Sequence, residues 1–277
     1  MNSSNLSVVT TVYNGEIYFN RAVPSILQQT YTNFEFIIAD DGSTDCTAQQ
    51  LRELTQNDQR VRVLSPGRLG RSQALNYAIE QTQADYIAIQ DFDDISYPER
   101  LRLQVEFLEA HPDVGLVACH YVLVDDNRQE QYIRMPATEH QQLVRTMAKC
   151  VPFAHTLVTY RRKAWMQAGG YPDVDSMVDL HLWIAFVRLG WRLATIPQVL
   201  GEHWVHPNSF WHQQFNYIKQ QQKLAQIQWQ AIQDLSLPLW MGVYPLGRYL
   251  YSYMPKTLKR YVRRTLAQSK EEDMAKR

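Results

Sequence analysis

Short apolar runs rich in β-branched residues alternate with helix-forming stretches through the first 90 residues, and this alternation restricts the fold more than any other feature. The runs predict strands at 7–13, 35–39, 61–64 and 85–90. The stretches between them predict a helix that ends near Leu27 and helices at 47–54 and 72–81. Strands joined by helical crossovers pair in parallel, and both faces of such a sheet are covered. We therefore expect an α/β fold with a mainly parallel, Rossmann-like sheet flanked by helices.

Pro98 opens the second part of the chain. The sequence after it predicts an amphipathic helix and then a strand-rich stretch at 114–124 that extends the sheet. The segment 210–235 is rich in glutamine and carries apolar residues at helical spacing, which predicts a long helix packed on the main body. We expect one main domain over 1–209 and a helical C-terminal extension over 210–277.

The extension changes from aromatic to basic towards its end. Aromatic and aliphatic side chains between Trp240 and Met254 precede a run of cations: Lys256, Lys259, Arg260, Arg263 and Arg264. Aromatic side chains beside clustered cations favour the surface of an anionic membrane. The sequence therefore predicts loose peripheral membrane association through 240–264, although packing is the commoner role of such aromatic residues.

Charge and cysteine content exclude several classes of protein. Among 277 residues, 28 lysines and arginines balance 28 aspartates and glutamates, so the net charge does not favour a nucleic-acid partner. Cys46, Cys119 and Cys150 are too few and too widely spaced for a disulfide framework or a zinc site. The sequence shows no secretory signal pattern and no apolar stretch long enough to span a bilayer, and we expect a cytoplasmic protein.

Two acidic clusters follow strands of the predicted sheet. Asp40 and Asp41 come after the second strand, and Asp91, Asp93 and Asp94 come after the fourth. The carboxyl ends of parallel strands lie at one edge of a sheet, so these like charges repel unless a cation compensates them. Carboxylate oxygens suit Mg²⁺ or Mn²⁺, which a bound diphosphate would share. Capping of the following helix is an alternative role for Asp41 and Asp94.

The acidic clusters belong to a longer series of motifs that covers about the first 210 residues. The series comprises 8–15 (VVTTVYNG), 25–31 (SILQQTY), 40–45 (DDGSTD), 68–76 (RLGRSQALN), 91–94 (DFDD), 96–101 (SYPERL), 169–171 (GGY) with Asp179, and 205–209 (VHPNS). In this order the motifs resemble those of the family 2 glycosyltransferases, which have the GT-A fold. The resemblance implies transfer of a sugar from a nucleotide-diphosphate donor, with a nucleotide-binding half at 1–97 and an acceptor half at 98–209.

The resemblance also implies which residues bind the donor. Tyr13 would stack on the base, most simply uracil, and Asp41 would accept its ring N–H. Thr11 would assist through its hydroxyl or backbone, and Arg71 and Asp93 would contact the rest of the nucleotide. The family commonly has an asparagine at the position of Arg68, which opens the same motif.

A metal site is implied by the same resemblance. Asp91, Asp93, Asp94 and His206 would hold Mg²⁺ or Mn²⁺, with Asp94 as the firmest ligand and Asp93 also near the ribose. The metal would neutralise the charge that grows on the departing diphosphate. The family has an arginine at the position of Trp204, so in this chain His206 or Arg71 would carry more of the phosphate binding.

Asp179 is the implied catalytic base. It would accept a proton from the acceptor hydroxyl in a single displacement that inverts the anomeric carbon. Val178 stands where the family usually has a glutamate, and Trp183 fits the buried anchor of the same helix. The sequence lacks the Gln-x-x-Arg-Trp motif and the membrane spans of processive synthases. We therefore expect transfer of one sugar to a polysaccharide, lipid-linked or protein glycan.

Two other classes of protein remain open at this stage. A nucleotidyltransferase would also bring acidic residues and a metal to a nucleotide, but it should carry a glycine-rich basic loop after the first strand, and 12–15 is a poor version of one. A non-catalytic protein that binds sugar nucleotides is the second class, because Val178 and Trp204 depart from the family pattern. His155 and His181 have no motif of their own, and a structural or acceptor-side role is expected for both.

Overall fold

A computed structural model describes residues 5–126, 129–174, 176–206, 217–255 and 258–259. Its first half is a parallel α/β unit in which four strands pair in the order β3-β2-β1-β4. The strands are β1 (Leu6–Val12), β2 (Phe34–Asp40), β3 (Val61–Leu64) and β4 (Tyr86–Ile89), and the helices are α1 (Phe19–Leu27), α2 (Thr47–Asn57) and α3 (Arg71–Glu80). The predicted α/β order is confirmed, with element ends within a few residues of the expected ones. Pro24 lies inside α1.

The second half continues the same sheet, but its strands run in both directions. Its elements are β5 (Ile95–Ser96), α4 (Arg100–Ala110), β6 (Val114–Asp125), β7 (Glu130–Arg134), α5 (His140–Met147), β8 (Thr159–Arg161), α6 (Arg162–Ala168), α7 (Val178–Arg188) and β9 (Arg192–Val205). β8 lies antiparallel between β4 and β6, and β9 is parallel to β6. β5 pairs antiparallel with β9, and β7 pairs antiparallel with β6. The sheet is therefore mixed where a mainly parallel one was expected. The antiparallel strand β8 was not predicted because its three residues are too few to show a period in the sequence.

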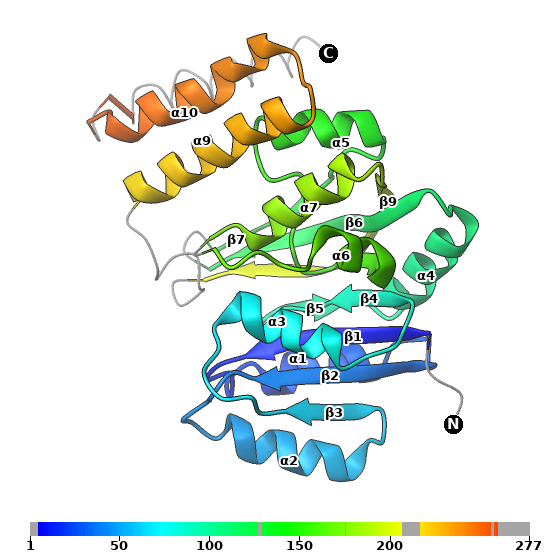
Figure 1. The fold of residues 1–277 in the computed structure, drawn as a ribbon. Coiled ribbons are helices and arrows are strands. Elements are labelled where there is room, and N and C mark those ends of the chain that lie inside the picture. Colours follow the sequence, from blue (N-terminus) through cyan, green and yellow to red (C-terminus); the bar gives the residue numbers. More distant parts are fainter. Residues whose placement is uncertain (1–4, 127–128, 175, 207–216, 256–257, 260–277) are drawn as a thin grey trace.

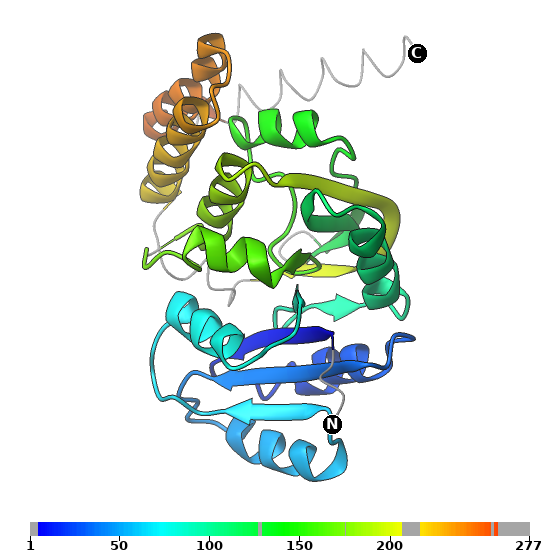
Figure 2. The same cartoon turned by 45° about the vertical axis from the view of Figure 1, so that its right-hand side comes forward.

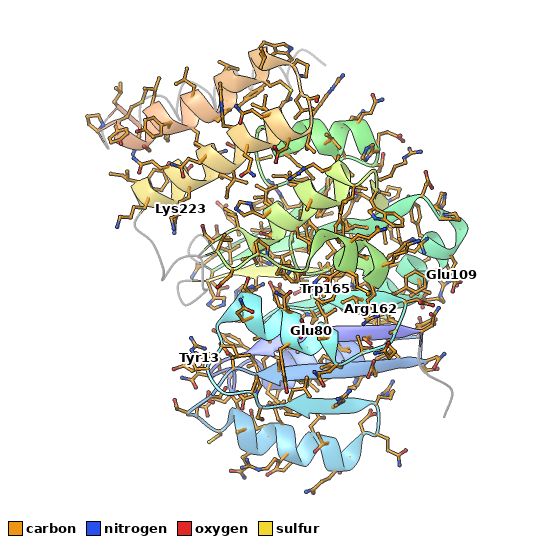
Figure 3. All side chains as sticks on the ribbon, viewed as in Figure 1. Tyr13, Glu80, Glu109, Arg162, Trp165 and Lys223 are labelled. Carbon is orange, nitrogen blue, oxygen red and sulfur yellow. The ribbon has the colours of Figure 1, made fainter. Side chains whose placement is uncertain are left out.

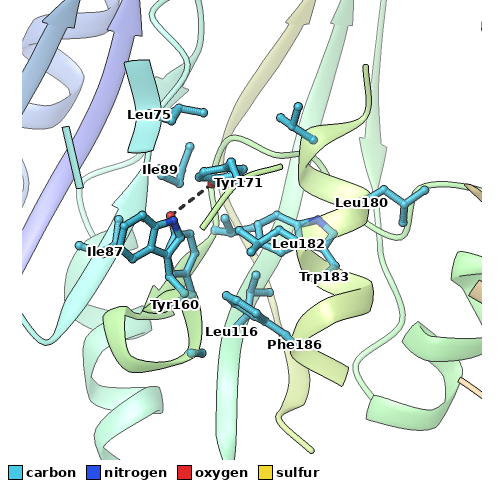
Figure 4. Packing of buried hydrophobic residues seen from close by; sticks show 14 of the residues in the cluster. Leu75, Ile87, Ile89, Leu116, Tyr160, Tyr171, Leu180, Leu182, Trp183 and Phe186 are labelled. Atoms are coloured by element: carbon cyan, nitrogen blue, oxygen red, sulfur yellow. Dashed lines mark hydrogen bonds between the residues drawn. The ribbon is translucent and has the colours of Figure 1, made fainter. Parts of the chain in front are cut away.

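Side chains alternate between the two faces of the sheet and build a core on each. On one face, Val9 and Ile37 join a cluster formed with α3, α6 and α7, the helices on the near side in Figure 1. Figure 4 shows the centre of this cluster, where Tyr160, Trp183 and Phe186 pack together. On the other face, the neighbouring strand residues pack against α1, α2 and α4. One continuous sheet covered on both sides therefore carries both halves of the chain.

The C-terminal extension is a helical hairpin at one end of the molecule. It consists of α9 (Tyr217–Asp234), the short 3₁₀ helix η1 (Leu239–Gly242) and α10 (Val243–Tyr253). Figures 1 and 2 show α9 and α10 side by side, at the end farthest from β3 and α2. Ile232 and Met241 pack on Ala148 next to α5, so the hairpin is attached to the main body. Residues 210–216 of the expected helix and most of the basic tail lie outside the described residues.

Arg100 in α4 is completely buried and is fully hydrogen-bonded. All five of its N–H groups donate to neutral acceptors at 2.7 to 3.1 Å. The acceptors are Gln104 Oε1, Gln90 Oε1, Ser96 Oγ and the carbonyl oxygens of Ile89 and Val158. Burial lowers the pKa of Arg100 to about 10, which still leaves the guanidinium charged at neutral pH.

Gln90 connects Arg100 to the acidic turn that follows β4. Its Oε1 accepts from Arg100, and its Nε2 donates to the carbonyl oxygens of Asp91 (3.0 Å) and Asp94 (2.9 Å). The backbone of the turn is therefore fixed from inside the protein, through contacts that leave the outer side of the turn accessible.

Replacement of Arg100 should destabilise the fold strongly. Arg100→Met leaves five buried acceptors short of a donor, and we expect the free energy of unfolding in urea to fall by about 3–5 kcal/mol. Arg102→Met on the exposed side of the same helix is the matched control. It removes only surface ion pairs with Glu99 and Glu106 and should cost about 0–1 kcal/mol. Similar losses in the two variants would show that the buried network contributes little.

Candidate functional site

The motif residues gather at the edge of the sheet formed by the carboxyl ends of β1, β2 and β4. Tyr13 directly follows β1, and Figure 3 places it at the outer edge of the molecule beyond the strand ends. Asp41 follows β2, the 91–94 turn follows β4, and Arg71 begins α3. Thr11 is half-buried near the end of β1. Ligands of open α/β sheets bind at this edge.

Asp41 is buried and accepts hydrogen bonds from one neighbouring loop. Leu69 N and Gly70 N donate to its Oδ1 at 2.6 and 3.0 Å, and Arg68 Nη1 donates to its Oδ2 at 2.8 Å. The guanidinium of Arg68 also lies over the ring of Tyr13, with Cζ 3.6 Å from the ring centroid. Tyr13 and Asp41, which were expected to bind the base, are thus brought together by Arg68.

The loop after β1 is fastened to the loop after β2. The backbone N–H groups of Asn14, Gly15 and Glu16 donate to Ser43 Oγ, Thr47 Oγ1 and Asp45 Oδ2 at 2.9 to 3.3 Å. Asn14 has a left-handed backbone (φ 53°), and its side chain accepts from Thr44 N at 2.7 Å. These three N–H groups are therefore already bound within the protein and do not form an open cradle for phosphate.

Asp91 forms an ion pair with Arg71 and lies close to His155. Arg71 Nη2 is 2.7 Å from Asp91 Oδ1 and 2.9 Å from His155 Nδ1. A guanidinium can only donate, so His155 Nδ1 accepts and the imidazole is neutral with its proton on Nε2. That Nε2–H then donates to the hydroxyl of Tyr171 at 2.9 Å. The chain of contacts ends at Tyr160, whose hydroxyl is 3.2 Å from that of Tyr171 (Figure 4).

The charges around Arg71 show which carboxylates face it. Burial alone would lower the pKa of Arg71, but the charges of Asp91, Asp93 and Asp179 raise it. Burial alone would also raise the pKa of Asp91, yet the Arg71 guanidinium holds that pKa well below its usual range. One guanidinium therefore faces carboxylates from the turn after β4 and from the start of α7.

Asp93 pairs with His206 at the end of β9. Asp93 Oδ2 and His206 Nε2 are 3.0 Å apart, and His206 Nδ1 is 3.5 Å from the hydroxyl of Tyr18. Two ligands at right angles, each about 2.1 Å from an ion, lie about 3.0 Å apart, so these two atoms can occupy neighbouring positions around Mg²⁺ or Mn²⁺. The contact with Tyr18 orients the imidazole in the way that metal-bound histidines require.

Asp94 turns away from this pair and is buried completely. Its Oδ1 accepts from Trp204 N at 2.7 Å, and its Oδ2 faces His203 Nδ1 at 3.1 Å. Burial raises the pKa of Asp94 to about 6. Burial would lower the pKa of His203, but Asp94 raises it to about 9. The contact with His203 and the hydrogen bond from Trp204 N together attach β9 to the turn.

The predicted metal ligands thus fall into three separate pairs. No group of three or more histidine, cysteine or acidic side chains close enough to hold an ion occurs in the part of the chain that the structure describes. Asp93 and His206 fit a cation that takes its remaining ligands from a diphosphate and water, which is common for Mg²⁺. Asp91 and Asp94 do not fit the same role in this arrangement, because Arg71 and the His203 contacts engage their oxygens. The role of Asp94 as the firmest ligand stays a prediction, and in this structure its oxygens contact Trp204 N and His203.

Asp179 lies in the first turn of α7 and is partly exposed. Among the described residues it forms no hydrogen bond or ion pair, although its charge acts on Arg71, Tyr171 and His181. Val178 beside it is buried in the core, where a glutamate would be costly. Trp183, one turn further, is completely buried, as expected for the anchor of this helix.

Trp204 stands where the family has an arginine, and the guanidinium of Arg21 lies over its ring. Its ring contacts His206 in a tilted arrangement (4.8 Å between centroids) and Tyr18 edge to face (5.7 Å), and the guanidinium of Arg21 lies over it, 4.5 Å from the centroid. Arg21 comes from α1, so its proximity to the site could not be read from the motif. The positive charge near His206 is therefore supplied from another element.

Several residues of the site carried no usable signal in the sequence. His155, His203, Tyr18 and Tyr171 contact the motif residues, yet each is an isolated residue of an ordinary type. Their partners lie between 16 and 188 positions away along the chain. The spacing of three residues between His203 and His206 was the one hint in the sequence. Residues an odd number apart on a strand point to opposite sides, and the two histidines contact different carboxylates, Asp94 and Asp93. His181, in contrast, is half-buried on α7 beside Asp179.

Comparisons with known proteins agree with the fold and with the family that the motifs resemble. The model of the family named Glycosyl transferase family 2 matches residues 7–168. EpsE of Bacillus subtilis (strain 168), described as a glycosyltransferase, is 30% identical over 278 residues, 98% of each chain. AmsE of Erwinia amylovora, an amylovoran biosynthesis glycosyltransferase, is 28% identical over 80% of this chain and 84% of its own.

Solved structures share the architecture at low sequence identity. TarS of S. aureus, in complex with UDP-GlcNAc, has a TM-score of 0.67 and 18% identity over 90% of this chain and 72% of its own. The mannosyltransferase PcManGT of Pyrobaculum calidifontis, in complex with GDP-Man and Mn²⁺, has a TM-score of 0.64 and 20% identity over 97% of this chain and 81% of its own. The chain has the GT-A fold and is a glycosyltransferase that belongs to glycosyl transferase family 2.

Proposed function

We propose that this enzyme transfers a single sugar from a UDP-sugar to a hydroxyl of a glycan or lipid-linked acceptor, with inversion at the anomeric carbon and with Mg²⁺ or Mn²⁺. The observation that carries the proposal is the convergence of Asp91, Asp93 and Asp179 on Arg71, with His206 beside Asp93. A diphosphate needs cations, and a hydroxyl nucleophile needs a base that is not already engaged. Both requirements are met at one edge of the sheet.

Each residue has one task in this proposal. Tyr13 and Asp41 recognise the base, and Arg71 binds the diphosphate as a fixed donor of hydrogen bonds. Asp93 and His206 hold the cation, which when bound neutralises charge on the leaving diphosphate. Asp179 accepts the proton of the acceptor hydroxyl, because its carboxylate has no hydrogen-bond partner among the described residues. Asp94 anchors β9 instead of binding the cation.

The relatives support the donor class and the setting. Two structural neighbours were solved with UDP-GlcNAc and with GDP-Man and Mn²⁺. AmsE is named for amylovoran biosynthesis, and WbnJ of Escherichia coli, 31% identical over 66% of this chain, is named for O-antigen biosynthesis. We extend from them to this enzyme a role in polysaccharide biosynthesis.

The loop after β1 argues against a nucleotidyltransferase. Such an enzyme needs free backbone N–H groups there for a triphosphate, whereas those of Asn14, Gly15 and Glu16 are bound to the loop after β2. A non-catalytic binding protein differs from the proposal at Asp179, which only a catalyst requires. The variants below separate these classes.

The cation site is tested with UDP and Mn²⁺. Wild-type protein should gain thermal stability from UDP, and Mn²⁺ should increase this gain. Asp93→Ala should abolish the Mn²⁺-dependent part because it removes a ligand. Asp94→Asn should retain it and instead lower the free energy of unfolding by about 1–3 kcal/mol. The reverse pattern, with the metal effect lost only in Asp94→Asn, would contradict the assignment. GDP is tested in the same way. Greater thermal stabilisation by GDP than by UDP would indicate a donor that carries guanine instead of uracil.

The catalytic base is tested by Asp179→Asn. Sugar transfer should fall by about a hundredfold to ten-thousandfold, while the dissociation constant of UDP with Mn²⁺ should change by less than about twofold. Asp173→Asn, at an exposed acidic residue shortly before α7, is the matched control and should transfer sugar at the wild-type rate. The anomeric configuration of the product, read by NMR, should be inverted. Retention, or full activity of Asp179→Asn, would overturn the mechanism.

We also propose that α10 rests on an anionic membrane at the cytoplasmic side. Leu239, Val243, Leu246, Leu250 and Tyr253 are 56% to 81% exposed and follow one another at spacings of four and three, which forms one apolar stripe. Exposed Trp240 and Tyr249 flank it, and the basic run from Lys256 to Arg264 follows in the sequence. The described helices include none that is long and apolar enough to cross a bilayer.

Membrane association is measured by co-sedimentation with vesicles of phosphatidylcholine and phosphatidylglycerol. Leu246→Glu with Leu250→Glu should lower the bound fraction by about tenfold or more, because each change removes an apolar contact and adds a repelled charge. Met166→Glu, at an equally exposed residue on α6, should bind as the wild type does. Equal binding by all three proteins would exclude a membrane role for this stripe.

A further inference from the structure

Arg68 occupies the two contacts that the nucleobase is proposed to make. Its guanidinium lies over the ring of Tyr13, with Cζ 3.6 Å from the centroid, and its Nη1 donates to Asp41 Oδ2 at 2.8 Å. We infer that the side chain of Arg68 stands in for the base in the free enzyme and is displaced from Asp41 when the donor binds. This inference rests on the proposed function, because it takes Tyr13 and Asp41 as the base site.

The hydrogen bonds of Asp41 leave no place for a ligand. A carboxylate offers about four acceptor positions. Leu69 N donates to Oδ1, Arg68 Nη1 donates to Oδ2, and the single N–H of Gly70 is shared between Oδ1 and Oδ2 (3.0 and 3.1 Å). Three donors of the chain itself therefore surround the carboxylate, and Arg68 Nη1 is the one side-chain donor among them. A ring N–H of a base can bind Asp41 only if one donor leaves, and the two backbone donors are held by the start of α3.

Arg68 is the donor that can leave. Its side chain is 56% exposed, whereas the side chain of Asp41 is 5% exposed, so the guanidinium can move into solvent without opening the core. A guanidinium and a pyrimidine ring are chemically alike at this place. Both are planar, both stack on an aromatic face, and both present N–H groups at the edge. The two therefore compete for the same surfaces.

Displacement also brings a positive charge to the diphosphate. Arg68 lies three residues before Arg71 on the loop that leads into α3, and Arg71 is the residue proposed to bind the phosphates. Once released from Asp41, the Arg68 guanidinium can pair with phosphate oxygens. Removal of Arg68 should therefore favour a nucleoside, which has no phosphate, more than the matching diphosphate.

The test compares uridine with UDP by isothermal titration calorimetry on the wild type, Arg68→Gln, Arg68→Lys and Arg52→Gln. Arg68→Gln should bind uridine about three- to tenfold more tightly than the wild type, because one exposed ion pair and one cation–π contact no longer compete. Its affinity for UDP should rise less or fall. Arg68→Lys keeps the charge but not the planar group, and its affinity for uridine should lie between those of the wild type and Arg68→Gln. Arg52→Gln, at an exposed residue of α2, should bind both ligands as the wild type does.

The outcomes separate the inference from the proposed function. Uridine binding that is unchanged or weaker in Arg68→Gln, with UDP still bound by the wild type, would overturn the inference and show that Arg68 holds the base. Guanosine and GDP are titrated in parallel, and if they bind where uridine and UDP do not, the same comparison applies to them. If no nucleotide binds to any variant, the proposed function fails and the inference fails with it. Unfolding curves of the variants should superimpose on that of the wild type, since Arg68 is exposed.

Discussion

Three carboxylates within four residues of chain are the constraint to which the rest of the site responds. Asp91, Asp93 and Asp94 would repel one another if they were left unpaired in a partly buried turn. The protein gives each of them a different partner: Arg71 from α3, His206 directly after β9, and His203 within β9. The turn itself is held from behind by Gln90, which Arg100 fixes in place. The contacts that relieve the repulsion also connect the first half of the chain to β9.

This division of partners also separates the roles of the three acidic residues. The carboxylate that is completely buried, Asp94, ties two strands together, and the one that faces solvent more, Asp93, remains beside a histidine that can share a cation. Asp91 keeps Arg71 in a fixed orientation, with His155 as the second contact. Because His155 accepts from Arg71 and donates to Tyr171, the orientation of the guanidinium depends on the aromatic core around Trp183. The core of the second half of the chain therefore positions a side chain at the edge of the sheet where the motif residues gather.

The sequence predicted the first half of the fold closely and the second half in part: the helix after Pro98, the strand at 114–124 and the long helix within 210–235 are present as α4, β6 and α9. The strand at 61–64 was placed at its observed ends, and the other strands and helices before Pro98 lie within a few residues, because buried parallel strands and their helices have strong, long periods. The two- and three-residue strands β5 and β8 have no period, so the antiparallel part of the sheet could not be foreseen. The motifs singled out the acidic residues, whereas the contacts of Asp93 and Asp94 come from residues far along the chain. Asp94, for example, accepts from a backbone N–H 110 residues away, which its local motif does not indicate.

The positions at which this chain departs from its family follow the same logic of pairing. Val178 fills the core where a glutamate would be buried without a partner, which leaves Asp179 as the partly exposed carboxylate at the start of α7. Trp204 replaces a cation but stacks beneath Arg21, so a positive charge remains near His206. Arg68 adds a charge where the family commonly has a neutral side chain, and Asp41 and the ring of Tyr13 hold it. At Trp204 and Arg68 a neighbouring group therefore compensates the change in charge, and at Val178 the apolar side chain removes the need for a partner.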